Sequence, residues 1–317
     1  SDPTQAAANW KAAKGFEANK YTLAGLSDAM RLGTGFENTT SLFFSYLDHY
    51  EPRPFNILDE FTLGYGFRSV FSISPGGEAG KSRIVLGIEN YRDEYTWSTY
   101  ENLYRDNDGE GSLKGDQLSR NKEFRNQFYA FGQFHWQATD RLKAQAGLTL
   151  NKTTYDFRDR FRAGDDNRSA VRDFDPVLMP SLDLRYTIGA HSWIYANVSR
   201  GFSNPSLEES LTPDGVINPD ISQEKGVNYE IGGTGFWFNK RLQASVALYQ
   251  MDIKDLLVAQ RIGEDEFIGR NAGQTRHRGL EASLQYFMRP GNTWSLSPFL
   301  SYTLSDHSFV DFKTEDS

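Results

Sequence analysis

The feature that most constrains the fold is a strict two-residue alternation that runs through long stretches of the chain. Over residues 142–151 the even positions are Leu, Ala, Ala, Leu and Leu, and the odd positions are Lys, Gln, Gly, Thr and Asn. The segments 242–249 and 280–286 also place Leu, Ala and Val at alternate positions. A period of two puts successive side chains on opposite faces of a strand. Each segment therefore predicts a β-strand with one apolar face and one more polar face.

Short turn signals separate these strands at intervals of roughly fifty residues, and long polar stretches lie between the turns. The polar stretches follow Phe157, Phe202 and Val258. The short turns are Thr139-Asp140, Gly189-Ala190, Asn239-Lys240 and Arg289–Asn292. Short turns at one end and long loops at the other describe up-and-down antiparallel hairpins. We expect an all-β chain with about twelve strands, beginning near Tyr21 and ending near Ser305.

Two architectures share this pattern, a sandwich with a buried apolar face and an outer-membrane barrel with its apolar face turned to lipid. The run Arg141–Phe157 contains no turn signal. It would extend about 55 Å at roughly 3.3 Å per residue, whereas a typical strand of a globular protein has about 5–6 residues. A membrane strand needs only about 10 residues, and its excess length stands above the bilayer. Strand length therefore favours the barrel.

Aromatic residues gather beside the short turns. A barrel carries aromatic girdles at its membrane borders, so the short-turn rim is where one girdle should fall. The alternative is that the rings plug the end of a sandwich, but strand length and ring placement together favour a transmembrane barrel. The residues beside the short turns are Trp136, Trp193, Trp237, Trp294, Phe134, Phe236, Phe238 and Phe287.

Composition excludes several classes of protein. The net charge is -8, which argues against a nucleic-acid partner because phosphate binding needs a basic face. No run of 18 apolar residues is present, so no transmembrane helix is expected. The first residues lack a charged-then-apolar leader, so we expect that a signal peptide was removed or that the chain is a piece of a longer one. The absence of Cys fits chance and export through an oxidising space equally well.

Four sequence motifs occur in order in the second half of the chain. They are SWIYANVSRGFSNPSLEE (192–209), NPDISQEKGVNYEIGGTG (218–235), ASVALYQMDIKDLLV (244–258) and NAGQTRHRGLEASL (271–284). Together they resemble the barrel of TonB-dependent outer-membrane receptors. The resemblance is firm over roughly 177–287 and looser over 41–156. The segments AAANWKAAKGFE and HYEPRPFNILDE look like parts of receptors for iron complexes.

The resemblance implies a multi-pass β-barrel in the outer membrane of a Gram-negative cell, in contact with membrane lipid. It also implies an energy transducer of the TonB type as partner, acting through a plug domain, and a ligand such as an iron–siderophore complex. The family barrel has 22 strands. We therefore expect residues 1–317 to be one partial barrel domain with about 12 of them, without plug and C-terminal strands. Such an open sheet would leave two unpaired membrane edges.

The stretch from Asn218 to Gly232 illustrates how a loop enters the barrel. Pro219-Asp220 is predicted to turn the chain back toward the membrane. Tyr229 and Ile231 are then predicted to face lipid, whereas Glu230 and Gly232 are predicted to face the lumen or the neighbouring rim. For Glu230, a place in a lumen network of charges is favoured over a ligand contact.

No motif for catalysis or for a resident cofactor is present. The sequence lacks G-x-S-x-G, P-loop and H-E-x-x-H patterns, and its five His have no metal-ligand spacing. The segment DNDGEGSLKGDQ partly matches a calcium loop through Asp106, Asp108 and Glu110, but Gln117 replaces the final Glu. A solvated acidic loop is the favoured interpretation, with a weak calcium site as the alternative. We expect neither enzymatic activity nor a cofactor.

Aromatic and basic residues alternate in the predicted loops. Rings and guanidinium groups would suit an anionic, aromatic iron chelate through cation–π contacts and charge-assisted hydrogen bonds. Rim packing and lipopolysaccharide contact are the alternative for each residue. The candidate ligand-binding residues are Tyr50, Arg53, Trp97, Tyr100, Tyr104, Arg158, Arg160, Phe161 and Arg162.

The leading hypothesis is an outer-membrane receptor segment that binds and imports a scarce large nutrient, most simply an iron–siderophore complex, with energy from the TonB system. A passive porin or structural barrel without plug is the main alternative. An outer-membrane phospholipase or protease would need a Ser/His or Asp/His cluster on the rim, which the sequence does not show. A secreted sugar-binding sandwich would be soluble without detergent. The sequence leaves the ligand, the transducing partner and the oligomeric state open.

Overall fold

The computed structural model describes residues 9–77, 80–205, 207–210, 218, 221–263, 266–271, 273–289, 291 and 293–311. As predicted, strands dominate. The helical elements in the described part are single turns: α1 (Trp10–Ala13), η3 (Tyr104–Asp106), η4 (Gly164–Asp166) and α2 (Leu207–Ser210). The strands are β1 (Ala18–Gly33), β2 (Phe36–Arg53), β3 (Asn56–Ile73), β4 (Ser82–Asn102), β5 (Lys114–Gln137), β6 (Leu142–Asp159), β7 (Ala170–Asp173), β8 (Val177–Ile188), β9 (Ser192–Ser203), β10 (Glu224–Trp237), β11 (Leu242–Lys254), β12 (Leu257–Gly263), β13 (Glu266–Asn271), β14 (Gln274–Tyr286) and β15 (Phe299–Asp311).

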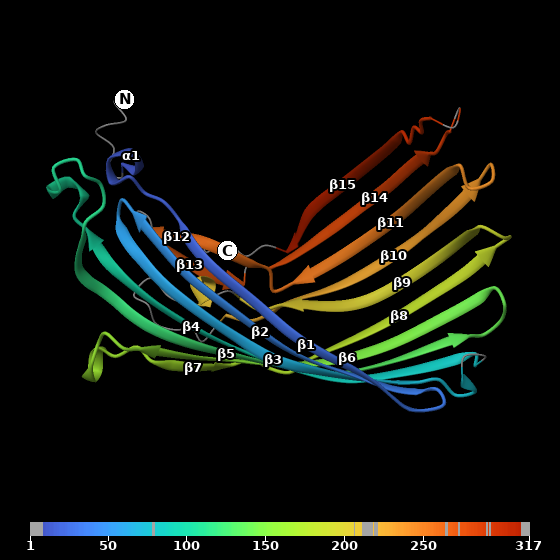
Figure 1. Ribbon diagram of the computed structural model, residues 1–317, viewed down its shortest axis with the longest axis horizontal. Helices are drawn as coiled ribbons and strands as arrows, with labels where there is room; N and C mark the ends of the chain where they lie inside the picture. Colours follow the sequence, from blue (N-terminus) through green and yellow to red (C-terminus); the bar gives the residue numbers. More distant parts are fainter. Residues whose placement is uncertain are drawn as a thin grey trace.

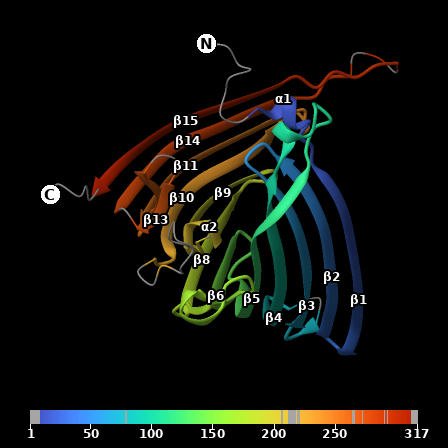
Figure 2. The ribbon, with the colours of Figure 1, turned by 90° about the vertical axis from the view of Figure 1, so that its left-hand side faces the viewer.

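Twelve of the strands form one antiparallel sheet in the order β1-β2-β3-β4-β5-β6-β8-β9-β10-β11-β14-β15, and β7 pairs with the end of β6 as the thirteenth. Strands β12 and β13 form a separate hairpin. Each main strand therefore pairs with the next main strand along the chain, which confirms the predicted up-and-down topology. The sheet curls into an open trough with β1 and β15 at its two edges (Figures 1 and 2). No described helix is long and apolar enough to cross a membrane.

The two rims of the trough differ as the sequence predicted. At one end, which we call the short-turn rim, β5–β6, β8–β9 and β10–β11 are joined by tight turns. The amides of Arg141 and Leu142 donate to Thr139 Oγ1 at 3.2 and 2.9 Å, and Gly189 adopts a φ of 68°. At the other end, the long-loop rim, the connections include 103–113, 160–176 and 255–273. The predicted turn at Pro219-Asp220 lies outside the described residues.

One continuous row of apolar side chains crosses eight strands. Neighbouring members are directly paired in the sheet, so they share one face. This face is exposed: Ile231 is 58% accessible, Leu248 51% and Leu304 58%. Such exposure is the opposite of a sandwich core and is typical of a face that meets lipid. The row consists of Trp136, Ala144, Leu184, Ala196, Ile231, Leu248, Leu280 and Leu304.

The next row, one residue away on every strand, is polar or small. It lines the opposite face, which is the lumen of a barrel. Within it the Asn197 amide donates to Asp183 Oδ1 at 2.5 Å. Next to it, the Tyr195 hydroxyl donates to Glu230 Oε1 at 2.5 Å. The predicted alternation over Tyr229–Gly232 is thus confirmed, with Glu230 in a lumen network. The row consists of Arg83, His135, Gln145, Asp183, Asn197, Glu230, Tyr249, Gly279 and Ser305.

Lumen rings lie flat on glycines of the neighbouring strand. Gly66 is paired with Phe43 on one side and Tyr91 on the other, and these two rings stack at 5.9 Å. A Cβ on Gly66 would lie 2.4 Å from the Asn90 carbonyl oxygen and 2.7 Å from the Phe43 ring. The glycine is therefore required by the close approach of a ring and a backbone, and not by its own dihedral angles.

Replacing Gly66 should destabilise the barrel. We expect Gly66→Ala to reduce the free energy of unfolding by about 1–3 kcal/mol, because the added methyl group overpacks a site that includes backbone. Gly201→Ala is the matched control, since nothing lies within 4 Å of its Cβ position. Urea unfolding of the natural full-length protein in lipid vesicles measures both variants. Equal stability of the two variants would contradict the packing argument.

Candidate functional site

The strands β4, β5 and β6 continue far beyond the membrane. On the outer face, their exposed lipid-facing apolar residues end at Ile88, Phe128 and Leu150, whereas Phe124, further along β5, is buried. Beyond these, the odd-numbered residues of 91–99, 119–127 and 151–159 point to the lumen side, because all three apolar residues are even-numbered and face outward. We call these odd-numbered residues the inner wall. It lies on the long-loop side, outside the membrane-spanning part of the strands.

Stacked aromatic rings form the upper part of the inner wall. The rings of Tyr95 and Trp97 stack at 4.7 Å and 18°, and Trp97 contacts the ring of Phe157 at 5.8 Å. Phe157 is buried, and Ala170 of β7 packs against it. Trp97 keeps part of its surface accessible. The arrangement is a rigid aromatic shelf of the kind that binds flat or apolar ligand groups.

A compact charged cluster lies just below the aromatic shelf. Arg125 Nε donates to Glu123 Oε1 at 2.5 Å and lies 3.9 Å from Asp93 Oδ1. The guanidinium also covers the ring of Tyr155 at 5.7 Å. Glu123 is fully buried, and its Oε2 has no hydrogen-bond partner. One cation thus faces two carboxyl groups in a site with little water.

Burial raises the pKa of both carboxyl groups above their ordinary range. For Glu123, burial outweighs the opposing attraction of Arg125, and for Asp93 the order of causes is the same. Burial also raises the pKa of Tyr155 to about 12. On the opposite face of β4 the neighbouring Glu94 behaves differently, because its hydrogen bond with Lys122 lowers its pKa. The inner wall therefore favours a neutral carboxyl group where the outer face favours a charged one.

The loops of the long-loop rim pack onto the inner wall and onto one another. The Tyr155 hydroxyl donates to the Pro205 carbonyl at 3.1 Å, and the Asn204 amide donates to Thr153 Oγ1 at 3.2 Å. Arg172 donates to the carbonyl of Ile221, which is buried. These contacts join segments that are about fifty residues apart in the chain. The loops are therefore held in place by long-range hydrogen bonds as well as by their own local turns.

Side-chain contacts also join the β12–β13 hairpin to this loop layer. The Asn218 amide donates to the Gly269 carbonyl at 3.2 Å, and the Ser222 amide donates to Asn271 Oδ1 at 2.6 Å. Asn271 Nδ2 returns a hydrogen bond to the Ser222 carbonyl at 2.9 Å. A loop layer cross-linked in this way can hold a binding surface in a defined shape.

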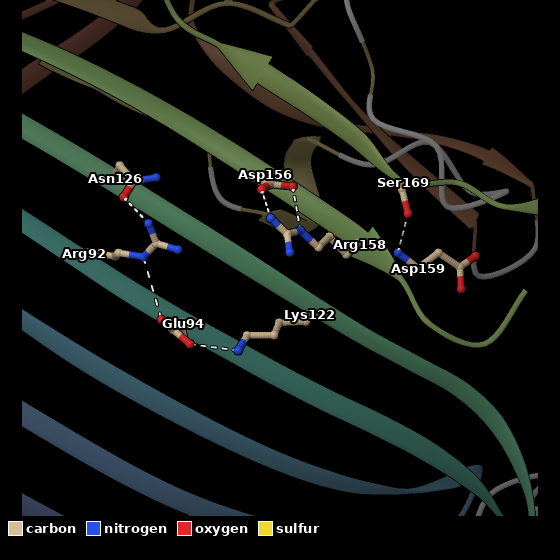
Figure 3. A network of polar contacts seen from close by, with 8 residues as sticks. All are labelled: Arg92, Glu94, Lys122, Asn126, Asp156, Arg158, Asp159 and Ser169. Atoms are coloured by element: carbon tan, nitrogen blue, oxygen red, sulfur yellow. Dashed lines mark hydrogen bonds and ion pairs between the residues drawn. The ribbon is translucent and has the colours of Figure 1, made fainter.

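Three of the predicted ligand-binding residues lie on the outer face. Tyr50, Tyr100 and Arg158 are even-numbered on their strands and share the face of Ile88. Lys114 Nζ lies 3.5 Å from the ring centre of Tyr100. Arg158 makes two hydrogen bonds with Asp156, at 2.7 and 3.2 Å (Figure 3). The structure therefore does not bring these three together with Trp97.

The other predicted residues lie at the rim. Arg53 closes the β2–β3 hairpin through a 2.9 Å bond from Nε to Asn56 Oδ1, and Tyr104 is buried in η3. The remaining three are exposed and follow β6, where the amides of two of them donate to Asp159 Oδ1 at 2.9 and 3.0 Å. Burial would raise the pKa of Asp159, but these amides reverse the effect and lower it. These three residues are Arg160, Phe161 and Arg162.

The candidate calcium loop is open to solvent. Asp106, Asp108 and Glu110 are all exposed, and Asp108 adopts a φ of 47°. Across the residues that the structure describes, no group of three or more His, Cys, Asp or Glu side chains is placed to hold a metal ion.

Sequence reasoning missed the charged cluster of the inner wall. Asp93, Glu123 and Arg125 come from two strands, and only their cross-strand register brings them together. Whether a residue number is odd or even was the signal in the sequence that could have placed these three side chains on the lumen face. Once Ile88 and Phe128 are assigned to lipid, the odd-numbered residues 91–99 of β4 and 119–127 of β5 must face the lumen, because the register is regular over these residues.

Comparison with known proteins agrees with this geometry. A family model described as TonB dependent receptor-like, beta-barrel matches residues 2–317. The copper transporter OprC superposes with a TM-score of 0.72 at 17% identity, over 92% of this chain and 48% of its own. The ferric citrate transporter FecA gives 0.74 at 12% identity, over 93% and 43%. The ferripyoverdine receptor of Pseudomonas aeruginosa gives 0.69 at 13% identity, over 91% and 40%.

The antiparallel sheet and its inner wall together are those of an outer-membrane β-barrel, in which one face of the sheet meets lipid and the other lines a lumen. The chain belongs to the TonB-dependent receptor family and forms part of its barrel domain. It spans less than half the length of these three structures, and at these identities the likeness concerns the fold alone. The family is one of transport receptors, not of enzymes.

Glu123 on the inner wall and Glu94 on the outer face should make the stability respond to pH in opposite directions. Relative to the wild type, Glu123→Gln should gain stability as pH rises through the raised pKa, because the wild type then carries a buried charge that the variant lacks. Glu94→Gln should instead be least stable, relative to the wild type, at neutral pH. Its deficit should begin to shrink as pH falls below about 4.3, the ordinary pKa of Glu in an unfolded chain, and should vanish only below the lowered pKa of Glu94 in the folded protein.

Thermal unfolding midpoints of the full-length protein in detergent, recorded between about pH 2 and pH 8, compare the two variants with the wild type. The expected result is two difference curves of opposite slope. Parallel curves would show that burial does not set the charge state of Glu123.

Proposed function

We propose that this chain is the barrel wall and loop layer of a receptor that binds a scarce, large nutrient, such as an iron–siderophore complex, and imports it with energy from a TonB-type transducer. The observation that carries the proposal is the inner wall: an aromatic shelf and buried charged cluster beneath a cross-linked loop layer, inside a barrel of this family. Solved structures with this fold include a ferripyoverdine receptor, the ferric citrate transporter FecA and the ferric yersiniabactin uptake receptor FyuA, which supports this ligand class.

Within this proposal Trp97 is the residue placed to contact the ligand from the inner wall, with Arg160, Phe161 and Arg162 approaching from the loop above. Phe161 is 47% exposed and both arginines are exposed, so a ring and two guanidinium groups are free to meet an anionic chelate. The other five candidate residues would then belong to the rim and the outer face. They are Tyr50, Arg53, Tyr100, Tyr104 and Arg158.

Trp97→Ala in the full-length protein should reduce uptake of the cognate iron chelate at least tenfold, because an aromatic hot spot of this kind contributes about 2 kcal/mol or more to binding. The measurement is uptake of radioactive iron from citrate, hydroxamate and catecholate chelates by iron-starved cells. Tyr100→Ala is the matched control, since its ring lies on the outer face of the same strand. Uptake by the control should equal that of the wild type.

The same assay separates a receptor from a passive porin. A receptor loses uptake when the transducer gene is deleted or the proton gradient is dissipated, whereas a porin does not. Uptake that survives both treatments, or that Tyr100→Ala impairs as much as Trp97→Ala, would contradict the proposal.

A further inference from the structure

We propose that the lumen wall of β11, β14 and β15 binds one soft, monovalent metal ion, Cu⁺, through Met251, His277 and His307. We call these three residues the soft-ligand row. The three strands are neighbours in the sheet (Figure 1). The site needs only their register, so it stands or falls separately from the inner wall and from the nutrient that the receptor imports.

The three side chains lie on the same face of the sheet. Met251 is paired with His277, and His277 is paired with His307. Each lies two residues nearer the long-loop rim than a member of the polar lumen row, with no shift in register between the two positions. Residues two apart on a strand share a face, so all three side chains point into the lumen. The two histidines are far apart in the sequence, and only the register makes them neighbours.

The two imidazole rings lie against each other. Their centres are 4.4 Å apart, and the ring planes are tilted by 56°. Nε2 of His277 lies 3.0 Å from Oγ1 of Thr275, which is buried. In the neutral tautomer that donates this hydrogen bond, Nδ1 of His277 keeps its lone pair for a metal ion. A hydrogen bond at one ring nitrogen and a metal at the other is the arrangement that orients metal-bound histidines.

Open space adjoins the thioether of the row. The side chain of Met251 is 37% exposed and borders a cavity of about 430 Å³ together with Asn228 and Ser199. Asn228 is paired with Met251, so this cavity lies on the lumen side. Toward the short-turn rim the ring of Tyr249 lies over Gly279, where a Cβ would be 2.5 Å from the ring. An ion in the row therefore rests above an aromatic ring and keeps room for water or a further ligand.

The neutral ligand set selects the kind of ion. A thioether and two neutral imidazoles are ligands of soft ions such as Cu⁺, whereas Mg²⁺ and Ca²⁺ need oxygen ligands. The arginines on either side of His277 lie on the outer face, where Arg276 Nε donates to Asp252 Oδ1 at 2.5 Å and Arg278 Nε donates to Gln250 Oε1 at 2.9 Å. Because the row contains no carboxylate, a monovalent ion leaves less uncompensated charge there than a divalent one.

The experiment measures the Cu⁺ affinity of the full-length, tag-free protein in detergent, under reducing conditions without oxygen, by competition with bathocuproine disulfonate. The double variant H277Q/H307Q should bind Cu⁺ at least tenfold more weakly than the wild type. Met251→Leu keeps the volume of the side chain, removes the sulfur and should also weaken binding about tenfold. The matched control H135Q/H191Q removes two histidines near the short-turn rim and should bind as the wild type does.

X-ray absorption of the Cu⁺-loaded protein identifies the ligands. The wild type should show two nitrogen ligands and one sulfur ligand, and Met251→Leu should lose the sulfur.

The proposal is overturned by equal Cu⁺ affinity of the double variant and the wild type, by equal loss in the control, or by a sulfur ligand that persists in Met251→Leu. Fuller occupancy with Zn²⁺ than with Cu⁺ at the same free concentration also overturns it. Circular dichroism checks that each variant is folded. Should the double variant fail to fold, His307→Gln alone takes its place.

Discussion

The structure depends on one constraint: a single sheet must satisfy its backbone internally while its two faces meet two different solvents. In a lipid bilayer an unpaired N–H or C=O group is costly, so each spanning strand needs a hydrogen-bonded neighbour on both sides. The two-residue period of a strand then separates the faces. The row through Ile231, Leu248 and Leu304 meets acyl chains, while the adjacent row through Asp183, Asn197 and Glu230 meets the lumen. The placement of the loops and of the inner wall follows from this separation of a lipid face and a lumen face.

Above the membrane the same alternation serves a different purpose. Once the outer face leaves lipid, charged groups such as Arg92 and Lys122 replace apolar ones there, and water or headgroups can solvate them. On the inner wall the change is the opposite, because side chains there become more buried. Loops close over it, Glu123 and Tyr155 lose contact with water, and aromatic rings pack against Phe157. One strand, β5, thus carries Lys122 as a paired surface cation next to Glu123 as a fully buried carboxyl group.

Sequence alone predicted the features that depend on the two-residue alternation of strands and on the residues that form turns. The turns at Thr139-Asp140 and Gly189-Ala190, and the outward Ile231 beside the lumen-facing Glu230, follow from alternation and turn chemistry. The site was harder to predict because it depends on register. Aromatic and basic residue types led to Tyr100 and Arg158, whose parity places them on the outer face. The Asp93–Arg125 contact joins residues on two strands whose relative offset no local pattern encodes, and Pro205 reaches Tyr155 only through the folded loop layer.

The central claim, that the apolar rows face lipid, is tested most directly by spin-label accessibility. The chain has no Cys of its own, so single cysteines along β11 from residue 242 to 250 can each carry one label. Labels at even positions should collide with oxygen dissolved in the bilayer, and labels at odd positions should collide with a water-soluble nickel complex. The two accessibilities should therefore oscillate with a period of two residues and in opposite phase. Low accessibility to both reagents at the even positions would mean that these side chains are packed inside protein, and the assignment of the apolar face to lipid would be wrong.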